Sequence, residues 1–337
     1  MTAIPLPDGL QRLLADGEQL RRCHRRGRYA PSPTGPLHLG NLQTALLSWL
    51  ISRLQGGEWL LRIDDLDTPR NRPGAEASIL VDLVWLGLCW DGPLIRQSER
   101  RGLYATVLSS LRRAGALYPC RCSRRLLADV SAPHGRSPVY PGFCRPLPPR
   151  WGPEEARLPS WRLALQPGRI GWDEQLAAAG VLDAERDVGD VVLRRADGFL
   201  AYHLATAVDE LSLGVADVVR GADLWSATGA QVALMQRLAG QPPRYWHTPL
   251  LTDAAGARLS KRQGGGGLAE LQQQGLDAAA VVGRLAAGVG LVPAGSRLSA
   301  AELLQDLTLE RLRDPLQRAL QDSESDLKNA ADSPHQT

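Results

Sequence analysis

The segment RYAPSPTGPLHLGN, residues 28–41, decides the fold of this chain. It begins as a short strand at residues 28–30, turns at proline and glycine, and enters a helix whose leucines recur every three or four residues until Gly56 and Gly57 end it. A strand, a turn and a helix N-terminus often hold phosphate, because free backbone N–H groups and the positive end of the helix dipole point at the ligand. In such a site Gly40 lets the backbone come close, and His38 can donate to a phosphate oxygen.

The composition is that of a globular chain without an export or membrane signal. At 337 residues, the chain suggests about two domains with ample apolar content for a core. Residues 1–22 carry charged side chains throughout and lack the apolar centre of a signal peptide. No run approaches the roughly 18 apolar residues needed to span a bilayer. We therefore expect a soluble, cytoplasmic protein without a membrane partner.

Arginine supplies almost all of the positive charge. The formal net charge of +3 is too small to indicate nucleic-acid binding on its own, and Lys261 and Lys328 are the only lysines. The basic cluster at residues 21–26 could follow a phosphate backbone, or it could be a solvated segment ahead of the first strand.

The remaining segments predict an α/β fold with an insertion. Residues 58–63 form an expected buried strand that ends in Asp64, and carboxylates at such strand ends lie where open α/β sheets bind ligands. We expect helices over residues 74–88 and from Ser98, as N-cap, to 113. The stretch 120–161 is rich in Pro, Arg and Ser and lacks periodicity. An Asp-Gly hairpin turn at 194–199 and the segments 202–209 and 215–223 then return to helix and sheet.

These segments divide the expected structure into six parts. They are an N-terminal extension (1–22), the first half of a split Rossmann-type domain (23–115), an insertion with a candidate zinc site (116–190), the second half (191–255), a loop with a helical subdomain (256–322) and a disordered tail (323–337).

A second motif, RLSKR at residues 258–262, contains one of the two lysines. Coding bias in this chain would supply arginine, so Lys261 indicates a need for a compact, flexible ammonium charge. The glycines at 264–267 follow directly and add mobility. An ordinary surface lysine is the alternative.

Residues 28–41 resemble the first signature of the class I aminoacyl-tRNA synthetases, and residues 258–262 resemble the second. The PSPTG sequence at 31–35 narrows the resemblance to the glutamyl and glutaminyl branch. The resemblance implies that an amino-acid carboxylate attacks the α-phosphorus of ATP, assisted by His38, Lys261 and Mg²⁺ on the phosphates. It implies an ATP site made of His38, Gly40, Asn41 and Lys261.

The same resemblance implies a site for L-glutamate. Its members are Arg28, Ala30, Ser32, Asp64, Tyr202 and Arg220. Two arginines suit a dicarboxylic amino acid because guanidinium groups form paired hydrogen bonds with carboxylates, and Arg220 matches the residue that pairs with the side-chain carboxylate. Asp64 stands where the family has glutamate, and its shorter side chain reduces its reach toward the substrate ammonium group.

Three of the five cysteines cluster in the insertion as Cys120-x-Cys122 and Cys144. An odd number of cysteines without a secretion signal argues against a disulfide framework. Three thiolates can bind one tetrahedral zinc ion with a further ligand, and the metal would order an insertion that buries little surface by itself. The other two, Cys23 and Cys89, are expected to be buried thiols.

The fourth zinc ligand is less clear from the residues alone. The family resemblance implies Tyr140, while His134 and Asp129 remain alternatives because phenolate rarely binds zinc. Three reduced cysteines and a lost metal are a further possibility.

The stretch that follows the Lys261 motif, residues 268–322, is short for this branch. Full glutamyl-tRNA synthetases add a large helical domain that reads the anticodon, so the chain most resembles the truncated paralogues that attach glutamate to the queuosine base of tRNA(Asp). We expect a monomer whose partners are ATP, L-glutamate and that tRNA. The alternatives are a minimal glutamyl-tRNA synthetase that charges tRNA(Glu), and a tRNA-binding module without catalysis.

Overall fold

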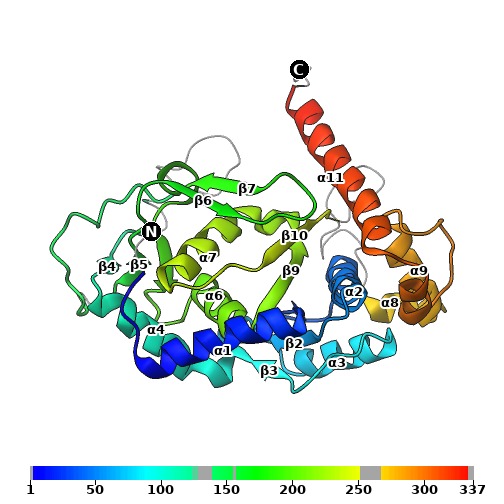
Figure 1. The fold of residues 1–337 in the computed structure, drawn as a ribbon, viewed down its shortest axis with the longest axis horizontal. Coiled ribbons are helices and arrows are strands. Elements are labelled where there is room, and N and C mark those ends of the chain that lie inside the picture. The colour runs from blue at the N-terminus through cyan, green and yellow to red at the C-terminus, as the bar shows by residue number, and fades with distance from the viewer. Residues whose placement is uncertain (1–2, 124–125, 127–138, 155–156, 251–266, 333–337) are drawn as a thin grey trace.

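A five-stranded parallel sheet forms the centre of the molecule, as seen in the computed structural model, which describes residues 3–123, 126, 139–154, 157–250 and 267–332. The strand order is β10-β9-β1-β2-β3. The chain therefore runs outward from β1 to β3, restarts beside β1 at β9, and runs outward again to β10 (Figure 1). In such doubly wound sheets ligands bind at the carboxyl ends of the strands where the direction reverses, here between β1 and β9. The strands are β1 (Arg26–Tyr29), β2 (Trp59–Ile63), β3 (Ile95–Arg96), β9 (Val215–Gly221) and β10 (Arg244–Thr248).

The helix α2 (Leu39–Leu54) follows β1 as the sequence predicts. Leu42, Leu46 and Leu50 share one face and are essentially fully buried, which explains why their spacing favours a helix. The helix packs against β1 and β9 and, on another side, against α9 and α10. This places its N-terminus at the switch point of the sheet.

The other helices surround the sheet in two groups (Figure 1). At one end, α8 to α11 gather beside α2 and share its apolar core, with Val282 and Leu312 among the buried side chains. On the other side, α1, α4, α6 and α7 share a second core with the insertion. The bounds are α1 (Asp8–His24), α3 (Ala75–Trp85), α4 (Arg101–Arg113), α6 (Tyr202–Ser212), α7 (Trp225–Arg237), α8 (Leu268–Gln273), α9 (Ala278–Ala287), α10 (Ala300–Gln305) and α11 (Leu309–Asp332).

The insertion leaves the parallel sheet after α4 and forms antiparallel pairs. β4 (Leu117–Cys120), β5 (Ser160–Leu163) and β8 (Val191–Arg194) make one sheet, and β6 (Arg169–Trp172) pairs with β7 (Gly180–Asp183). Because β8 pairs with β5, the start of the expected second half belongs to the sheet of the insertion. The expected turn at 194–199 is present, with Gly198 donating its N–H to the carbonyl of Arg195.

The expected N-terminal extension is largely helical and packed. α1 lies against α6 and β9, and Leu10 joins the second core. At Gly17 the helix approaches the backbone of Leu211 so closely that a Cβ atom would have no room. The basic residues around 21–26 are partly used inside the protein, since Arg21 donates to the carbonyl of Glu210 and Arg26 pairs with Glu58.

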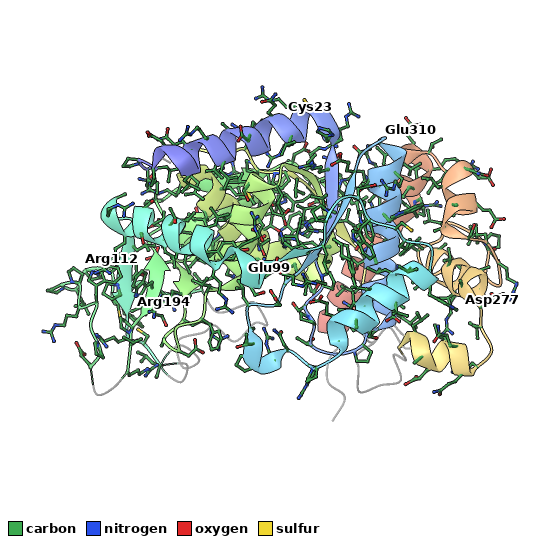
Figure 2. The ribbon with its side chains drawn as sticks, turned by 90° about the horizontal axis from the view of Figure 1, so that it is seen from below. Cys23, Glu99, Arg112, Arg194, Asp277 and Glu310 are labelled. Atoms are coloured by element: carbon green, nitrogen blue, oxygen red, sulfur yellow. The ribbon has the colours of Figure 1, made fainter. Side chains whose placement is uncertain are left out.

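Two local predictions are wrong, and one helix extends beyond its expected end. α4 begins at Arg101 after a short 3₁₀ turn, Gln97–Arg100, that contains Ser98, so Ser98 does not stand at its N-cap position, which Arg100 occupies. α11 continues to Asp332, well into the expected disordered tail, because no proline or glycine interrupts the chain between Pro315 and that point. Cys23 and Cys89 are exposed, and Cys23 lies on the outer side of α1 (Figure 2).

Among the helices of the described residues, none is both long and apolar enough to cross a membrane.

Candidate active site

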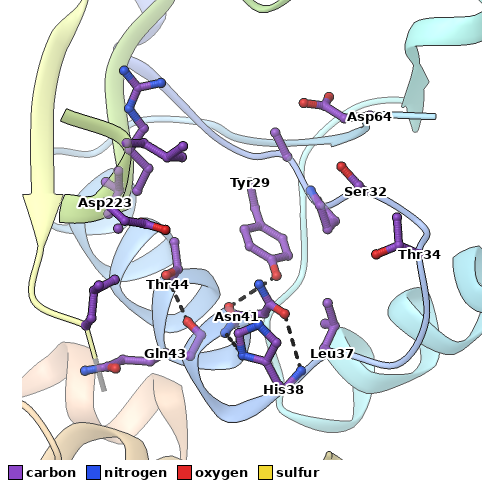
Figure 3. Close-up of a pocket in the computed structure, with 18 of the residues that line it drawn as sticks. Tyr29, Ser32, Thr34, Leu37, His38, Asn41, Gln43, Thr44, Asp64 and Asp223 are labelled. Atoms are coloured by element: carbon purple, nitrogen blue, oxygen red, sulfur yellow. Dashed lines mark hydrogen bonds between the residues drawn. The ribbon is translucent and has the colours of Figure 1, made fainter. Parts of the chain in front are cut away.

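A pocket of about 430 Å³ opens at the switch point between β1 and β9. All of the expected ATP- and glutamate-binding residues within the described chain line it, although they come from four separate segments (Figure 3). Of the expected residues, the pocket is lined by Arg28, Ala30, Ser32, His38, Gly40, Asn41, Asp64, Tyr202 and Arg220.

His38 and Asn41 shape the N-terminus of α2. The Nδ1 atom of His38 accepts a hydrogen bond from the backbone N–H of Asn41 at 3.3 Å, and the Asn41 side chain accepts from the backbone N–H of His38 at 3.3 Å (Figure 3). An imidazole that accepts at Nδ1 carries its proton on Nε2, which leaves Nε2 as the donor. Gly40 lies directly beside this ring, where a Cβ atom would come within 3.2 Å of it. The helix start therefore offers backbone and imidazole donors, as a phosphate site requires.

Lys261 lies outside the described residues, as does the rest of the stretch 251–266. The residues on both sides of that stretch border the pocket. Pro249 and Leu250 line it, and Gly267 pairs with His38 as an isolated antiparallel bridge. The chain therefore leaves and re-enters the described structure at the edge of the pocket.

Arg28 is held by a buried ion pair that the sequence alone does not reveal. Its Nε donates to Glu210 Oε1 at 2.8 Å, and its Nη1 donates to the carbonyl of Val219 at 3.1 Å. Arg62 approaches the same carboxylate at 3.5 Å. Burial alone would raise the pKa of Glu210, but the two guanidinium groups outweigh it and keep that pKa below its ordinary value. Glu210 thus remains charged and fixes Arg28 at the pocket wall.

Asp64 lines the pocket but is already paired with Arg62. Arg62 donates from Nε to Oδ1 at 2.7 Å and from Nη2 to Oδ2 at 3.2 Å. Burial raises the pKa of Asp64 to about 6, against the opposing effect of Arg62. Both carboxylate oxygens of Asp64 therefore already bind a guanidinium group.

Arg220 lies at the pocket wall with a different kind of support. It is 4% exposed, and its guanidinium donates to Gln231 Oε1 at 2.8 Å, to Thr228 Oγ1, and to His247 Nε2 at 3.4 Å. The ring of Tyr245 lies 5.0 Å from its central carbon. In the part of the chain that the structure describes, Arg220 forms no ion pair with a carboxylate. Within the described residues, its guanidinium is therefore held by neutral acceptors, with no carboxylate in direct contact.

Ala30, Ser32 and Tyr202 complete the expected amino-acid contacts. Ala30 and Ser32 follow β1 into the pocket, while Tyr202 begins α6 and is 41% exposed at the opening. An exposed phenol at the pocket mouth can reach a bound ligand without leaving the helix.

Sequence reasoning missed the residues that support this site from behind. Glu210 and Asp209 lie on α6, and Thr228 and Gln231 lie one helical turn apart on α7, so each pair faces the site from one helix. The sequence signal that could have revealed these residues is the presence of acidic and polar side chains on helical faces that are otherwise apolar. His247 and Glu174 meet only through tertiary structure, which no local pattern shows.

The cysteine cluster is a second, separate constellation. The sulfur atoms of Cys120, Cys122 and Cys144 all lie within 4.8 Å of one another. The hydroxyl of Tyr140 lies 3.5 Å from the sulfur of Cys120 and 3.6 Å from that of Cys122, and it accepts the backbone N–H of Cys144 at 2.9 Å. His134 and Asp129 fall outside the described residues, so only Tyr140 can be placed.

These four atoms fit a tetrahedral zinc ion. Zn–S bonds of about 2.3 Å imply S···S edges of about 3.8 Å, and the Cys122 and Cys144 sulfurs are 3.6 Å apart. Burial and the neighbouring thiols raise the pKa of Tyr140, and the N–H of Cys144 opposes them only in part. The three sulfurs therefore suit a metal ion, and the hydroxyl of Tyr140 lies beside two of them.

Comparison with known protein families identifies one match over most of the chain. The family model described as tRNA synthetases class I (E and Q), catalytic domain, matches residues 25–286. A protein of Prochlorococcus marinus (strain MIT 9303), named glutamyl-Q tRNA(Asp) synthetase, is 56% identical over 306 residues, which cover 91% of this chain and 95% of that protein. A protein of the same name from Deinococcus radiodurans is 48% identical over 255 residues, or 74% of this chain and 83% of that one.

Two solved structures show the same fold. One is a glutamate tRNA ligase from Elizabethkingia meningosepticum in complex with its amino acid, with a TM-score of 0.70 and 26% identity over 85% of this chain. The present chain spans 65% of that ligase. The other is a glutamate-tRNA synthetase from Elizabethkingia anophelis, with a TM-score of 0.70 and 25% identity, covering 91% of this chain and 73% of that one.

Proposed function

This chain belongs to the glutamyl-Q tRNA(Asp) synthetase family within the class I tRNA synthetases, and on that basis we propose that it activates L-glutamate with ATP and transfers the glutamyl group to the queuosine base of tRNA(Asp). The observation that carries the choice of amino acid is Arg220. A buried guanidinium without a carboxylate partner in the described chain, facing a pocket, suits a ligand that brings its own carboxylate.

The activation step needs little covalent chemistry from the protein. The α-carboxylate oxygen of glutamate attacks the α-phosphorus of ATP, a P–O bond forms, and the bond to pyrophosphate breaks. We assign His38 Nε2 and the N-terminal N–H groups of α2 to the phosphate oxygens. Mg²⁺ bound to the phosphates would neutralise part of their charge, and the ammonium group of Lys261 would add a further positive charge.

The amino acid is oriented by groups on two sides of the pocket. Arg28 and Ser32 lie on the β1 side, and Arg220 lies on the β9 side. We propose that Arg220 binds the side-chain carboxylate of glutamate and that Tyr202, with Asp64, receives its ammonium group. Asp64 shares its charge with Arg62, so we expect Tyr202 to matter more for the ammonium group than Asp64 does.

Activation should not require tRNA. Every proposed contact to ATP and glutamate comes from this chain, so no group borne by tRNA is needed to complete the pocket. We propose a monomer as the acting unit. We propose that both steps take place in the cytoplasm, where the tRNA substrate is found.

We further propose one structural zinc ion in the insertion, bound by Cys120, Cys122, Cys144 and Tyr140. The convergence of three sulfurs and one phenol oxygen supports the metal. Its role would be to order the segment between β4 and β5, which contributes little to the two large cores.

The main alternative is a glutamyl-tRNA synthetase that charges the 3′ end of tRNA(Glu). The relatives that match nearly end to end carry the queuosine-related name, which favours the base as acceptor. A tRNA-binding module without catalysis is less favoured, because His38, Gly40 and the arginines of the pocket are all in place.

ATP–pyrophosphate exchange tests the proposed activation. We expect exchange that depends on L-glutamate, needs no tRNA and is weak with L-aspartate, whose shorter side chain cannot reach Arg220 and the α-carboxylate site together. Exchange only in the presence of tRNA, or with another amino acid preferred, would contradict the proposal.

A further inference from the structure

Behind Arg220 lies a closed ring of hydrogen bonds that nothing in the activation chemistry uses. Arg220 donates from Nη2 to Thr228 Oγ1 and from Nε to His247 Nε2, and Thr228 Oγ1 lies 2.9 Å from the same Nε2 atom. The Thr228 hydroxyl also lies 3.2 Å from the carbonyl of Leu224, so its single proton goes either to that carbonyl or to Nε2. A guanidinium can only donate, so the contact between Arg220 and His247 requires that Nε2 accept and carry no proton.

Glu174 fixes that condition from the other side of the imidazole. Its Oε2 lies 2.6 Å from His247 Nδ1, and its Oε1 accepts the backbone N–H of His247 at 3.1 Å. A carboxylate at Nδ1 requires the imidazole proton there, which leaves Nε2 free to accept. Burial lowers the pKa of His247 against the opposing effect of Glu174, so the ring stays neutral.

The kind of acceptor that contacts Arg220 determines whether its guanidinium can bind a substrate carboxylate. A carboxylate in direct contact with Arg220 would neutralise it and compete with a substrate carboxylate. Here the acceptors are all neutral, and the carboxylate of Glu174 stands one imidazole away. A guanidinium has five N–H donors, and three of them hold Arg220 in place. Two N–H groups therefore remain for a bidentate contact in the pocket.

Glu174 comes from the insertion, not from the nucleotide-binding halves. It follows β6 in a segment that pairs with the outer strand β10, where Tyr245 donates its N–H to the carbonyl of Asp173 at 2.8 Å and Gln175 donates to the carbonyl of Tyr245 at 2.9 Å. The insertion thus adds a short piece of strand to the sheet edge and delivers one buried carboxylate, 7% exposed, behind the pocket.

We infer that Glu174 and His247 are positioning residues that set the hydrogen-bond polarity around Arg220 and thereby determine the selectivity for glutamate over its neutral amide, glutamine. This inference rests on the proposed function, because it assumes that Arg220 binds the side-chain carboxylate. It assigns the insertion a role in amino-acid selection in addition to any role in binding tRNA.

The decisive variant is Glu174→Gln. Its amide can donate to Nδ1, which moves the imidazole proton to Nε2 and points an N–H at the N–H of Arg220. We expect the KM for glutamate in pyrophosphate exchange to rise about tenfold, since one buried donor loses its acceptor. The KM for ATP and the kcat should change little, and the preference for glutamate over glutamine should fall. A merely structural role would instead lower all activities together and leave that preference intact.

Two further variants separate polarity from packing. His247→Gln can accept from Arg220 and donate to Glu174, so it should retain most of the glutamate preference, whereas His247→Leu should lose it. The matched control is Glu58→Gln, which disrupts another carboxylate–histidine pair, Glu58 with His24 at 3.0 Å, far from the pocket. It should leave the glutamate KM and the preference unchanged.

A double-mutant cycle and one spectrum complete the test. If Glu174 acts through Arg220, then Glu174→Gln should add little to the loss already caused by Arg220→Lys. Nitrogen NMR of the histidine side chains, with His247 identified by His247→Gln, should show the proton on Nδ1 in the wild-type protein and on Nε2 in Glu174→Gln. An unchanged proton position on His247 in Glu174→Gln, or losses from the two substitutions that simply add, would overturn the inference and leave glutamate activation untouched. Absence of glutamate-dependent exchange by the wild-type protein would instead overturn the proposed function itself.

Discussion

Replacing Glu210 by glutamine should destabilise the protein and weaken glutamate binding together. Glu210 belongs to a buried charge cluster in which three guanidinium groups balance three carboxylates. Its members are Arg28, Arg62, Arg100, Asp64, Asp209 and Glu210. The glutamine side chain has the same shape, so the change removes one negative charge and leaves an uncompensated positive charge beside the pocket.

The size of the effect follows from the burial. Glu210 is 1% exposed and lies 2.8 Å from Arg28, and removing one partner of a buried ion pair costs about 3 kcal/mol or more. The amide oxygen can still accept one bond from Arg28, which keeps the loss at the lower end. Because Arg28 then loses its charged anchor, the KM for glutamate should rise while the KM for ATP stays close to that of the wild type.

Urea unfolding of both proteins at pH 7 measures this loss. A matched control is Glu76→Gln, because Glu76 pairs with Arg96 at 2.7 Å but both side chains are about one-third exposed. The control should lose less than about 1 kcal/mol. Equal losses for the two variants, or no loss for Glu210→Gln, would refute the claim that the buried cluster holds Arg28.

The pH dependence supplies a second check on the same variant. The pKa of Glu210 in the folded protein lies below its ordinary value, so its stabilisation is complete above the ordinary glutamate range and is lost as the pH falls through the folded pKa. The difference in unfolding free energy between wild type and Glu210→Gln should therefore be full at neutral pH and shrink in acid. A difference that grows toward acid would contradict the sign of the shift.

Three other predictions concern the metal, the mobile charge and the ammonium contact. Protein purified without added metal should contain one zinc per chain. Cys122→Ser should empty the site and make the insertion sensitive to proteases, while ATP binding remains. Metal-free wild-type protein, together with unchanged protease resistance in Cys122→Ser, would argue against the site. Lys261→Ala should lower the exchange rate by about 10² with the fold intact, whereas a near-wild-type rate would remove this lysine from the mechanism. Burial raises the pKa of Asp64 to about 6, and only the charged carboxylate attracts the substrate ammonium group. The KM for glutamate should therefore rise as the pH falls below that value, and Asp64→Asn should abolish this dependence. Identical pH profiles for both proteins would exclude Asp64 as a contact.

Local sequence patterns predicted the first strand and α2 well. The leucine spacing of α2 and the Pro-Gly turn before it are short-range features, and their physical causes lie within a few residues. The expected pocket residues come from segments far apart in the chain, yet they meet at the switch point because a doubly wound sheet brings the carboxyl ends of β1 and β9 together.

The supporting residues could not be predicted in the same way. His247 receives its tautomer from Glu174, which is 73 residues away in the chain, and the two meet only after the insertion pairs with β10. Ser98 lies inside the 3₁₀ turn that precedes α4, where its backbone N–H donates to Asp65 Oδ1 from a distant part of the chain. Cys23 was expected to be buried from its residue type, but α1 buries its opposite face against α6. In each case a tertiary contact overrides the local preference.

The most direct test of the whole account compares two forms of one tRNA. Purified protein, ATP and labelled L-glutamate are incubated with tRNA(Asp) that carries queuosine and with the same tRNA that carries unmodified guanosine at that position. Glutamate should be incorporated only into the queuosine form, because the cyclopentene diol of the modified base is the proposed acceptor. Equal incorporation into both forms, or incorporation only into tRNA(Glu), would contradict the account and favour a glutamyl-tRNA synthetase acting at the 3′ end.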